Sequence, residues 1–228
     1  MTEQDKAYPK SAVGQPLALE PRPVTEDGRR FSPSVARNRD VLAEAFAQVD
    51  LRSGHVLEIA SGTGEHGAYL TAAFERLHWT YSDIDPDSQA SQRAWKRHMN
   101  NSRLSGPHII DTSKSDWGKV EAAGPYDAIF CANMIHIAPF AAAEGLFAGA
   151  GRALHSGAPL CLYGPFARGG EIAPSNARFR DDLQRRDPSW GVRDLDLQLV
   201  PVAKNNGLHL QTVIEMPANN LFVCFYKT

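Results

Sequence analysis

The sequence has 228 residues, of which 43% are hydrophobic and 22% are charged, with a formal net charge of -2 at pH 7. This composition is that of an ordinary globular chain, long enough to bury the core of one large α/β domain. It lacks the basic excess of a nucleic-acid-binding protein, and no apolar run approaches the roughly 20 residues that span a bilayer. We therefore expect neither a nucleic-acid nor a membrane partner.

The first 30 residues are rich in proline and polar side chains and show no periodicity, which predicts a flexible or extended arm over residues 1–30. They contain no apolar core of a secretory signal, so we expect a cytoplasmic protein. Residues 31–228 are predicted to form a single domain. Three cysteines without metal-ligand spacing are expected as buried, reduced thiols, and we predict no metal site: Cys131, Cys161 and Cys224.

From residue 31 the pattern alternates between helices and strands. Ser32 and Pro33 predict a helix start, followed by apolar residues at helical spacing up to residue 49. Further helices are predicted from residue 65 to 74 and over 87–101, 140–154, 176–186 and 194–206. Strands are predicted over 56–60, 79–82, 108–110, 126–132, 160–163, 208–215 and 221–226.

The last two predicted strands are joined by MPANN, which is too short for a crossover helix, so they are expected to be antiparallel. The other strands alternate with helices, which is typical of a parallel sheet covered on both faces. The predicted fold class is therefore α/β and Rossmann-like. It has a seven-stranded, mostly parallel sheet, a C-terminal antiparallel hairpin and helices on both faces, the arrangement of class I methyltransferases.

The segment HVLEIASGTGEHGAYL, residues 55–70, spells G-x-G-x-x-G between a predicted strand and a predicted helix. Such a turn lets the backbone approach a nucleotide cofactor at a helix N-terminus. Asp83 ends the next strand about 20 residues further on, where a carboxylate can accept from ribose hydroxyls. Asp85, next to Pro86, is interpreted as a helix cap. The cofactor residues expected here are Ala60, Ser61, Gly62, Gly64, Asp83 and Ile84.

Glu58 stands inside the first apolar strand, where NAD-binding turns commonly carry an apolar residue. An acidic residue at this position is typical of methyltransferases, so Glu58 favours S-adenosylmethionine as the cofactor. Asp111 and Thr112 follow the third predicted strand and are expected to contact the adenine. Asp116 is an alternative acceptor there, and Trp117 either stacks on the adenine or packs in the core.

The fourth predicted strand runs into CANMIHI, at the end of the sheet where open α/β folds bind ligands. Asn133 is expected to contact the cofactor, and His136 is the candidate general base. The Asn/Asp-Pro-Pro-aromatic stretch of nucleobase amino-methyltransferases is missing here, which argues against nucleobase amines. Tyr163 is the second candidate catalytic residue. Further residues expected to bind the acceptor are Arg37, Asn38, Asn176, Trp190, Arg193 and Asn219, with Asn220 beside them.

Several long segments resemble the domain of unknown function 938 family, also called the methyltransferase-like 26 family. They include EIASGTGEHGAYL, SDIDPDS, FCANMIHIAPF, LYGPF, DPSWGVRD and MPANNL, and the resemblance covers about residues 31–228. It implies a class I S-adenosylmethionine-dependent methyltransferase fold and says little about the substrate.

The leading hypothesis is methyl transfer from S-adenosylmethionine, with S-adenosylhomocysteine as product, to a small-molecule acceptor that the sequence does not name. One alternative is a non-catalytic cofactor-binding or partner subunit with the same fold, since fold does not imply chemistry. A second is an NAD-dependent oxidoreductase, which the glycine spacing permits and which Glu58 and the C-terminal hairpin oppose. The methylated atom and the oligomeric state stay open.

Overall fold

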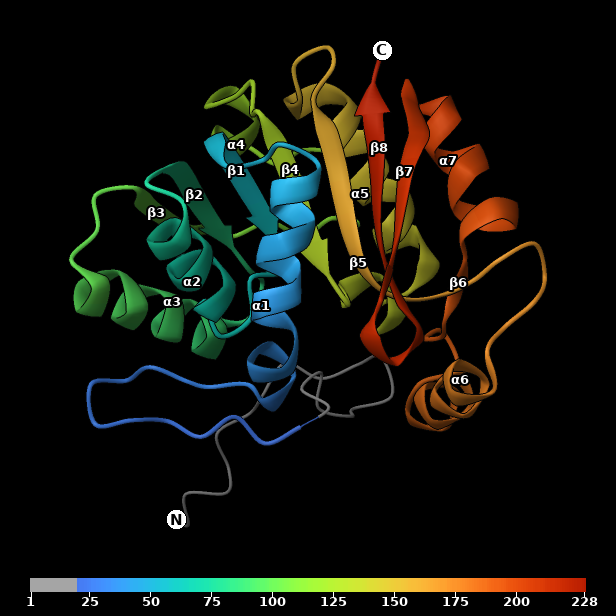
Figure 1. Ribbon diagram of the computed structural model, residues 1–228, viewed down its shortest axis with the longest axis horizontal. Coiled ribbons are helices and arrows are strands. Elements are labelled where there is room, and N and C mark those ends of the chain that lie inside the picture. Colours follow the sequence, from blue (N-terminus) through green and yellow to red (C-terminus); the bar gives the residue numbers. More distant parts are fainter. Residues whose placement is uncertain (1–19) are drawn as a thin grey trace.

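The strands lie side by side in the order β3-β2-β1-β4-β5-β8-β7, in a computed structural model that describes residues 20–228 (Figure 1). Strand β8 is antiparallel to both of its neighbours, and the other pairs along this order are parallel. The bounds are β1 (Ser53–Ile59), β2 (Arg76–Ser82), β3 (Leu104–His108), β4 (Ala128–Ala132), β5 (Pro159–Ala167), β7 (Leu208–Met216) and β8 (Asn220–Lys227). The predicted fold class and its antiparallel hairpin are confirmed.

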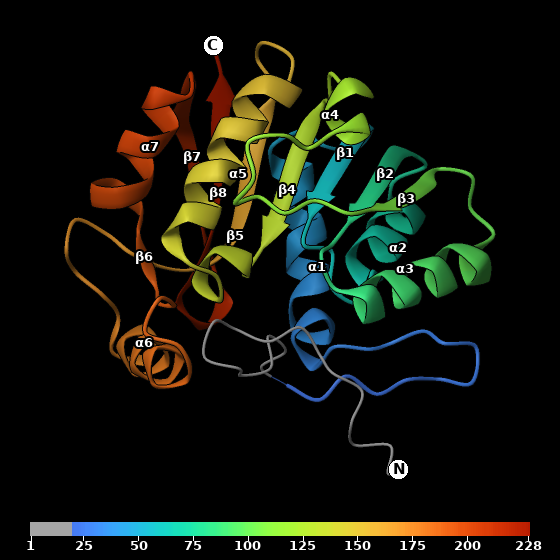
Figure 2. The same ribbon diagram turned by 180° about the vertical axis from the view of Figure 1, so that it is seen from behind.

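Helices cover both faces of this sheet (Figures 1 and 2). One face carries α1 (Pro33–Gln48) and α2 (Glu65–Ala73), with α3 (Pro86–Met99) beside them; the other carries α4 (Lys119–Ala122), α5 (Phe140–Ala153) and α7 (Val200–Asn205). Helix α6 (Pro174–Arg186) lies near the carboxyl end of β5. Short helical turns span Met134–His136, Leu195–Leu199 and Pro217–Asn219.

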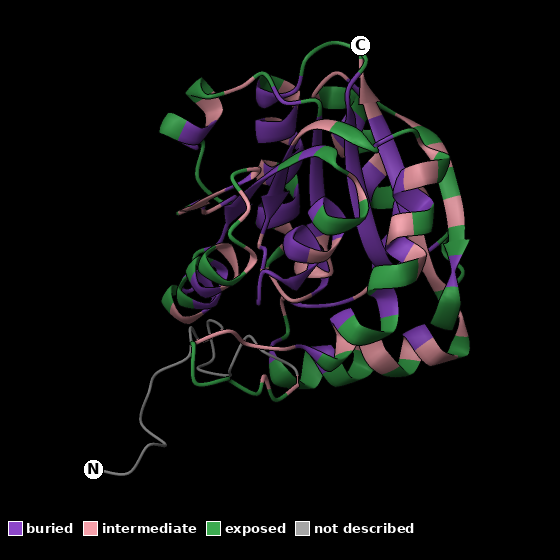
Figure 3. Cartoon of the chain, turned by 60° about the vertical axis from the view of Figure 1, so that its left-hand side comes forward, coloured by how far each residue is buried: buried purple, intermediate pink, exposed green. Residues whose placement is uncertain are grey.

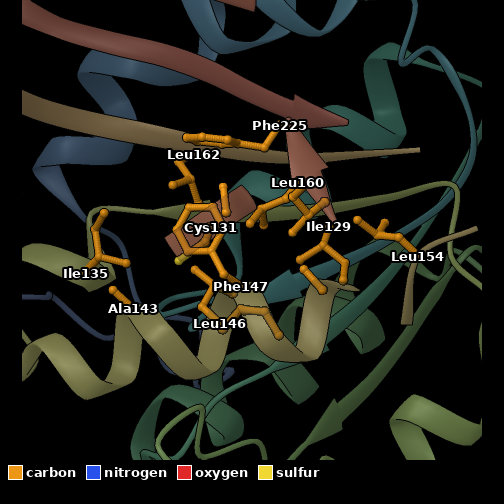
Figure 4. Close-up of a cluster of buried hydrophobic side chains, with 14 of the residues drawn as sticks. Ile129, Cys131, Ile135, Ala143, Leu146, Phe147, Leu154, Leu160, Leu162 and Phe225 are labelled. Carbon is orange, nitrogen blue, oxygen red and sulfur yellow. The ribbon is translucent and has the colours of Figure 1, made fainter. Parts of the chain in front are cut away.

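The sheet is the centre of the hydrophobic core (Figure 3). All nine residues of β5 are buried, as expected for a parallel strand covered on both faces. Between the sheet and α5, apolar side chains that include Phe147, Leu162 and Phe225 pack together (Figure 4). On the opposite face, Phe46 from α1 packs edge-to-face against Phe130 from β4. The two clusters fix the strand ends from which the ligand-facing loops emerge.

Helix starts follow the predicted capping only in part. Asp85 caps α3, since its carboxylate accepts from the N–H groups of Asp87 and Ser88, as predicted. Ser32 precedes Pro33 at the start of α1, but its hydroxyl pairs with Ser34 rather than with the helix backbone. The three cysteines are buried free thiols, as predicted.

Two predicted boundaries are wrong. The third strand covers Leu104–His108 rather than 108–110, because the Gly106–Pro107 pair, which reads as a break, is tolerated in a strand at the sheet edge. A two-residue strand, β6 (Arg193–Asp194), pairs with β5 and adds an eighth strand to the seven predicted. Asp194 therefore caps the following π-helical turn instead of starting a helix.

Within residues 20–228, every helix is too short or too polar to cross a bilayer. The same residues contain no group of three or more His, Cys, Asp or Glu side chains that could hold a metal ion.

Candidate cofactor and acceptor site

A cavity of about 970 Å³ opens at the carboxyl ends of β1, β2, β4 and β5. The chain turns there from the β2 side to the β4 side of β1, which is the switch point where open α/β sheets bind ligands. Its volume is near the upper end of the roughly 300–1,000 Å³ of small-molecule sites, enough for a nucleotide cofactor beside a second small molecule. The predicted site residues that line it are Arg37, Asn38, Ala60, Ser61, Gly62, Asp83, Ile84, Asp111, Thr112, Asn133, His136, Tyr163, Asn176 and Trp190.

The glycine turn has two functions. Gly62 has φ +54°, and a Cβ there would meet only the Arg22 guanidinium, at 3.8 Å or more, so this part of the turn is open to the cavity. Gly64 has φ +87° and does not line the cavity. A Cβ on Gly64 would lie 3.1 Å from the Gln92 backbone, so this glycine permits α2 to pack against α3 rather than contacting a ligand.

Asp83 connects the ends of β1 and β2. Its Oδ2 accepts from the Gly62 N–H at 2.8 Å, and its Oδ1 accepts from the Asp85 N–H at 2.9 Å. Burial raises the pKa of the Asp83 carboxyl to about 6, against the opposing effect of these two donors and of the Arg22 guanidinium. An ionised carboxylate has about four acceptor positions, so Asp83 keeps capacity for two further donors, such as the ribose hydroxyls.

Glu58 does not line the cavity, in contrast to its predicted contact with the cofactor. Its Oε2 accepts from Trp79 Nε1–H at 2.9 Å, and its Oε1 lies 3.4 Å from His66 Nδ1. On the other side of the ring, His66 Nε2 lies 3.0 Å from Asn38 Oδ1. Glu58 is therefore the inner end of a buried polar chain that reaches the cavity through His66 and Asn38.

Sequence reasoning missed His66, which lines the cavity and is buried. The one signal in the sequence that pointed to His66 is the buried carboxylate of Glu58, because such a group requires a polar partner. His66 follows the glycine turn closely, so the helix start that places the turn also places this ring.

Asp111 and Thr112 lie where β3 leads into the cavity, and Asp111 Oδ1 accepts from the N–H and hydroxyl of Ser113. The two alternatives at this position, Asp116 and Trp117, do not line the cavity. Trp117 is 3% exposed and packs so closely on α5 that a Cβ on Gly149 would lie 2.0 Å from its ring, so it does not stack on a ligand. Asp116 instead accepts from the Gly118 N–H.

On the opposite side of the cavity, His136 ends a short turn after β4 and is 1% exposed. Neither ring nitrogen has a hydrogen-bond partner within residues 20–228, and the ring packs edge-to-face on Phe166. Burial and the neighbouring Arg193 guanidinium lower the pKa of His136 to about 3. The ring is thus neutral near pH 7, with one nitrogen able to donate and one to accept.

Arg193 does not line the cavity, although it was predicted to bind the acceptor. Its guanidinium donates to the carbonyls of Ile135 (2.9 Å), Ala138 (2.6 Å) and Ser189 (2.9 Å). Arg193 therefore holds the turn that carries His136.

Asn219 also lies outside the cavity lining, and its neighbour Asn220 lines it instead. The side-chain amide of Asn219 donates to Ser175 Oγ at 2.8 Å, and the backbone carbonyl of Asn219 accepts from Asn176 Nδ2 at 2.9 Å. These bonds tie the β7–β8 hairpin to the start of α6. Further lining residues that the sequence did not indicate are Glu20, Arg22, Phe179, Asp182 and Arg186.

Solved structures of methyltransferases share this fold. A putative O-methyltransferase from Nostoc punctiforme matches with a TM-score of 0.72 and 18% identity, over 88% of this chain and 58% of its own. Human N-acetylserotonin methyltransferase, solved in complex with SAM, matches with a TM-score of 0.68 and 14% identity, over 85% of this chain and 52% of its own. This chain thus spans little more than half the length of either protein.

A putative sarcosine dimethylglycine methyltransferase from Galdieria sulphuraria matches with a TM-score of 0.62 and 15% identity, over 87% of this chain and 72% of its own. At these identities the similarity establishes the fold. A sequence model described as "Protein of unknown function (DUF938)" matches residues 29–227, nearly the whole described chain. The chain therefore belongs to the DUF938 family and has the α/β fold of S-adenosylmethionine-dependent methyltransferases.

Proposed function

We propose that this protein transfers a methyl group from S-adenosylmethionine to a small-molecule acceptor bound in the same cavity. The observation that carries the proposal is that one cavity is lined by two different sets of polar groups. An open glycine turn and Asp83 lie on one side, and the unpaired ring of His136 lies on the other. A cofactor and an acceptor that occupied these two sides would meet inside the cavity.

The cofactor side fits the chemistry of S-adenosylmethionine. The open backbone at Gly62 leaves room for the cofactor, and Asp83 keeps acceptor capacity for the ribose. Asp111 and Thr112 line the same cavity, and in the proposal they contact the adenine edge. The bound cofactor would supply a reactive sulfonium methyl group. The protein's contribution is then to align the acceptor and exclude water.

On the acceptor side, His136 orients the acceptor by exchanging a hydrogen bond with its hydroxyl or N–H group. A general base works best with a pKa near the operating pH, and a pKa of about 3 makes this imidazole a weak base in the ligand-free protein. Phe179 and Trp190 add apolar walls to the cavity, which favour a molecule with a flat apolar part. Tyr163 contributes a hydroxyl beside Asn38.

The proposal is tested by incubating the protein with isotopically methyl-labelled S-adenosylmethionine and pools of small hydroxyl, amine and thiol compounds. We expect labelled product and S-adenosylhomocysteine with at least one pool, and loss of both in Asp83→Ala. Cofactor binding without turnover on any pool would instead support the non-catalytic alternative. Turnover unchanged in Asp83→Ala would place the cofactor elsewhere.

A further inference from the structure

The segment before α1 forms a strap along α3 and the cavity mouth, which we define as residues 20–32 (Figure 1). A β-bridge between Val24 and Arg30 folds it back on itself. The Arg30 N–H donates to Ser91 Oγ at 2.8 Å, and the Ser32 N–H donates to Glu65 Oε2 at 2.6 Å. The backbone of the strap is therefore fixed to the first residue of α2 and to the second turn of α3, the two helices that follow β1 and β2.

Side chains add to this attachment. Phe31 packs edge-to-face on Trp95 of α3, with the ring centroids 5.2 Å apart. The Arg29 guanidinium lies over the same Trp95 ring at 4.9 Å, and Arg30 forms an ion pair with Asp87 at 2.8 Å. Aromatic and cation–π contacts of this kind stabilise the packing of the strap on α3. The strap is thus a packed part of the fold. Its residues 20–30 belong to the predicted arm, and residues 1–19 of that arm lie outside the described residues.

Arg22 projects from the strap to the glycine turn. Its Nη2 lies 3.8 Å from the position of a Cβ on Gly62, and its Nη1 donates to Ser88 Oγ at 3.4 Å. Arg22 forms none of the ion pairs that join residues of the described chain. Its guanidinium is half-buried at the edge of the cavity, with donors left for a ligand.

The other arginines of the cavity are less suited to the cofactor. Arg37 is paired with Glu20 at 2.8 Å, and Arg186 belongs to α6 on the far side. The carboxylates on the cofactor side, such as Asp83 and Asp111, would repel an anionic group. Arg22 is therefore the basic residue that lies beside the glycine turn and forms no ion pair within residues 20–228, although its charge also favours the ionised form of Asp83.

We propose that Arg22 binds the carboxylate of the methionine part of S-adenosylmethionine, so that the strap closes the cofactor site. The assignment rests on the proposed function, because it takes that cofactor as the ligand. A carboxylate leaving water needs a charged partner, and the planar guanidinium fork matches a carboxylate with two parallel hydrogen bonds. The family model begins at residue 29, so Arg22 stands before the matched region, and the structure rather than the motif indicates it.

The test compares two ligands that differ in the carboxylate. S-adenosylhomocysteine carries it, and 5′-methylthioadenosine lacks the whole amino-acid part. Calorimetric titration of Arg22→Gln should show about a 10- to 100-fold higher Kd for S-adenosylhomocysteine, and a Kd for 5′-methylthioadenosine within about twofold of the unsubstituted protein, as expected for one lost charge-assisted contact. Arg22→Lys should restore part of the affinity, since it keeps the charge and loses the fork.

Arg76→Gln is the matched control, because it removes the same charge from an exposed position at the far end of β2. It should change neither Kd, and the melting temperature of each ligand-free variant shows that it folds. Equal weakening of both ligands, or none, by Arg22→Gln would overturn the carboxylate assignment. Failure of the unsubstituted protein to bind S-adenosylhomocysteine would instead contradict the proposed function itself.

Discussion

The two halves of the cavity differ in how far their polar groups are already paired. On the cofactor half, both oxygens of Asp83 accept backbone N–H groups, and both oxygens of Glu58 contact buried side chains. On the acceptor half, both nitrogens of His136 are unpaired within residues 20–228, although Arg193 holds the turn that carries this residue through the carbonyls of Ile135 and Ala138. The cofactor half is thus assembled without a ligand, whereas the acceptor half leaves hydrogen-bonding capacity to one. Three tests can break or sharpen this contrast.

The largest expected effect comes from Arg193→Leu. It removes a buried guanidinium and leaves three carbonyls without their donor, so we expect a loss of unfolding free energy of about 3–5 kcal/mol. Urea unfolding of the variant and of the unsubstituted protein measures this loss. Because the freed turn belongs to the acceptor half, the Kd for S-adenosylhomocysteine should stay within about threefold, given a folded protein. A much larger rise in that Kd would show that the two halves are not separable.

The next effect concerns the pH dependence of stability at Asp83. Its folded pKa of about 6 lies above the ordinary value of 3.8, so the folded state holds the proton more tightly and loses stability as the pH rises from about 4 to 6. The unfolding free energy of Asp83→Asn, relative to that of the unsubstituted protein, should therefore rise by about 3 kcal/mol between pH 3 and pH 7. Urea unfolding at several pH values measures the difference. A pH-independent difference would contradict the raised pKa of this buried carboxyl.

The smallest of the three tests the polar chain of the cofactor half. Glu58→Gln and His66→Gln should each lower the unfolding free energy by about 1–3 kcal/mol, and the double variant should lose less than the sum, since the residues contact each other. Their coupling in urea unfolding should be about 0.5–3 kcal/mol. Leu197→Ala serves as a control for an exposed position. If the two losses of unfolding free energy simply add, Glu58 and His66 do not interact as this polar chain requires.

The contrast also explains what the sequence could predict. The glycine turn and Asp83 are encoded locally, by a strand, a turn and the end of the next strand, so their place beside the cavity followed from spacing alone. Arg193 and Asn219 resembled ligand contacts because they are polar residues in loops, yet both satisfy groups from distant segments. Their partners depend on tertiary packing, which no local pattern reports. Arg22 was missed because the segment around it lacks periodicity.

The strand and core predictions also succeeded where the signal is local and failed where tertiary packing decides. Buried strands such as β4 and β5 were recognised by their apolar runs, whereas the edge strand β3 was displaced because its Gly106–Pro107 pair resembles a turn. Trp117 had two interpretations from the sequence, and only the close approach of Gly149 decides for packing.

The central claim is that this cavity is a site for S-adenosylmethionine, and calorimetric titration of the unsubstituted protein with S-adenosylhomocysteine and, separately, with NAD tests it most directly. We predict one-to-one binding of S-adenosylhomocysteine with a Kd on the order of micromolar, which corresponds to about -8 kcal/mol, and no binding of NAD. Binding of NAD alone, or of neither ligand, would contradict the account.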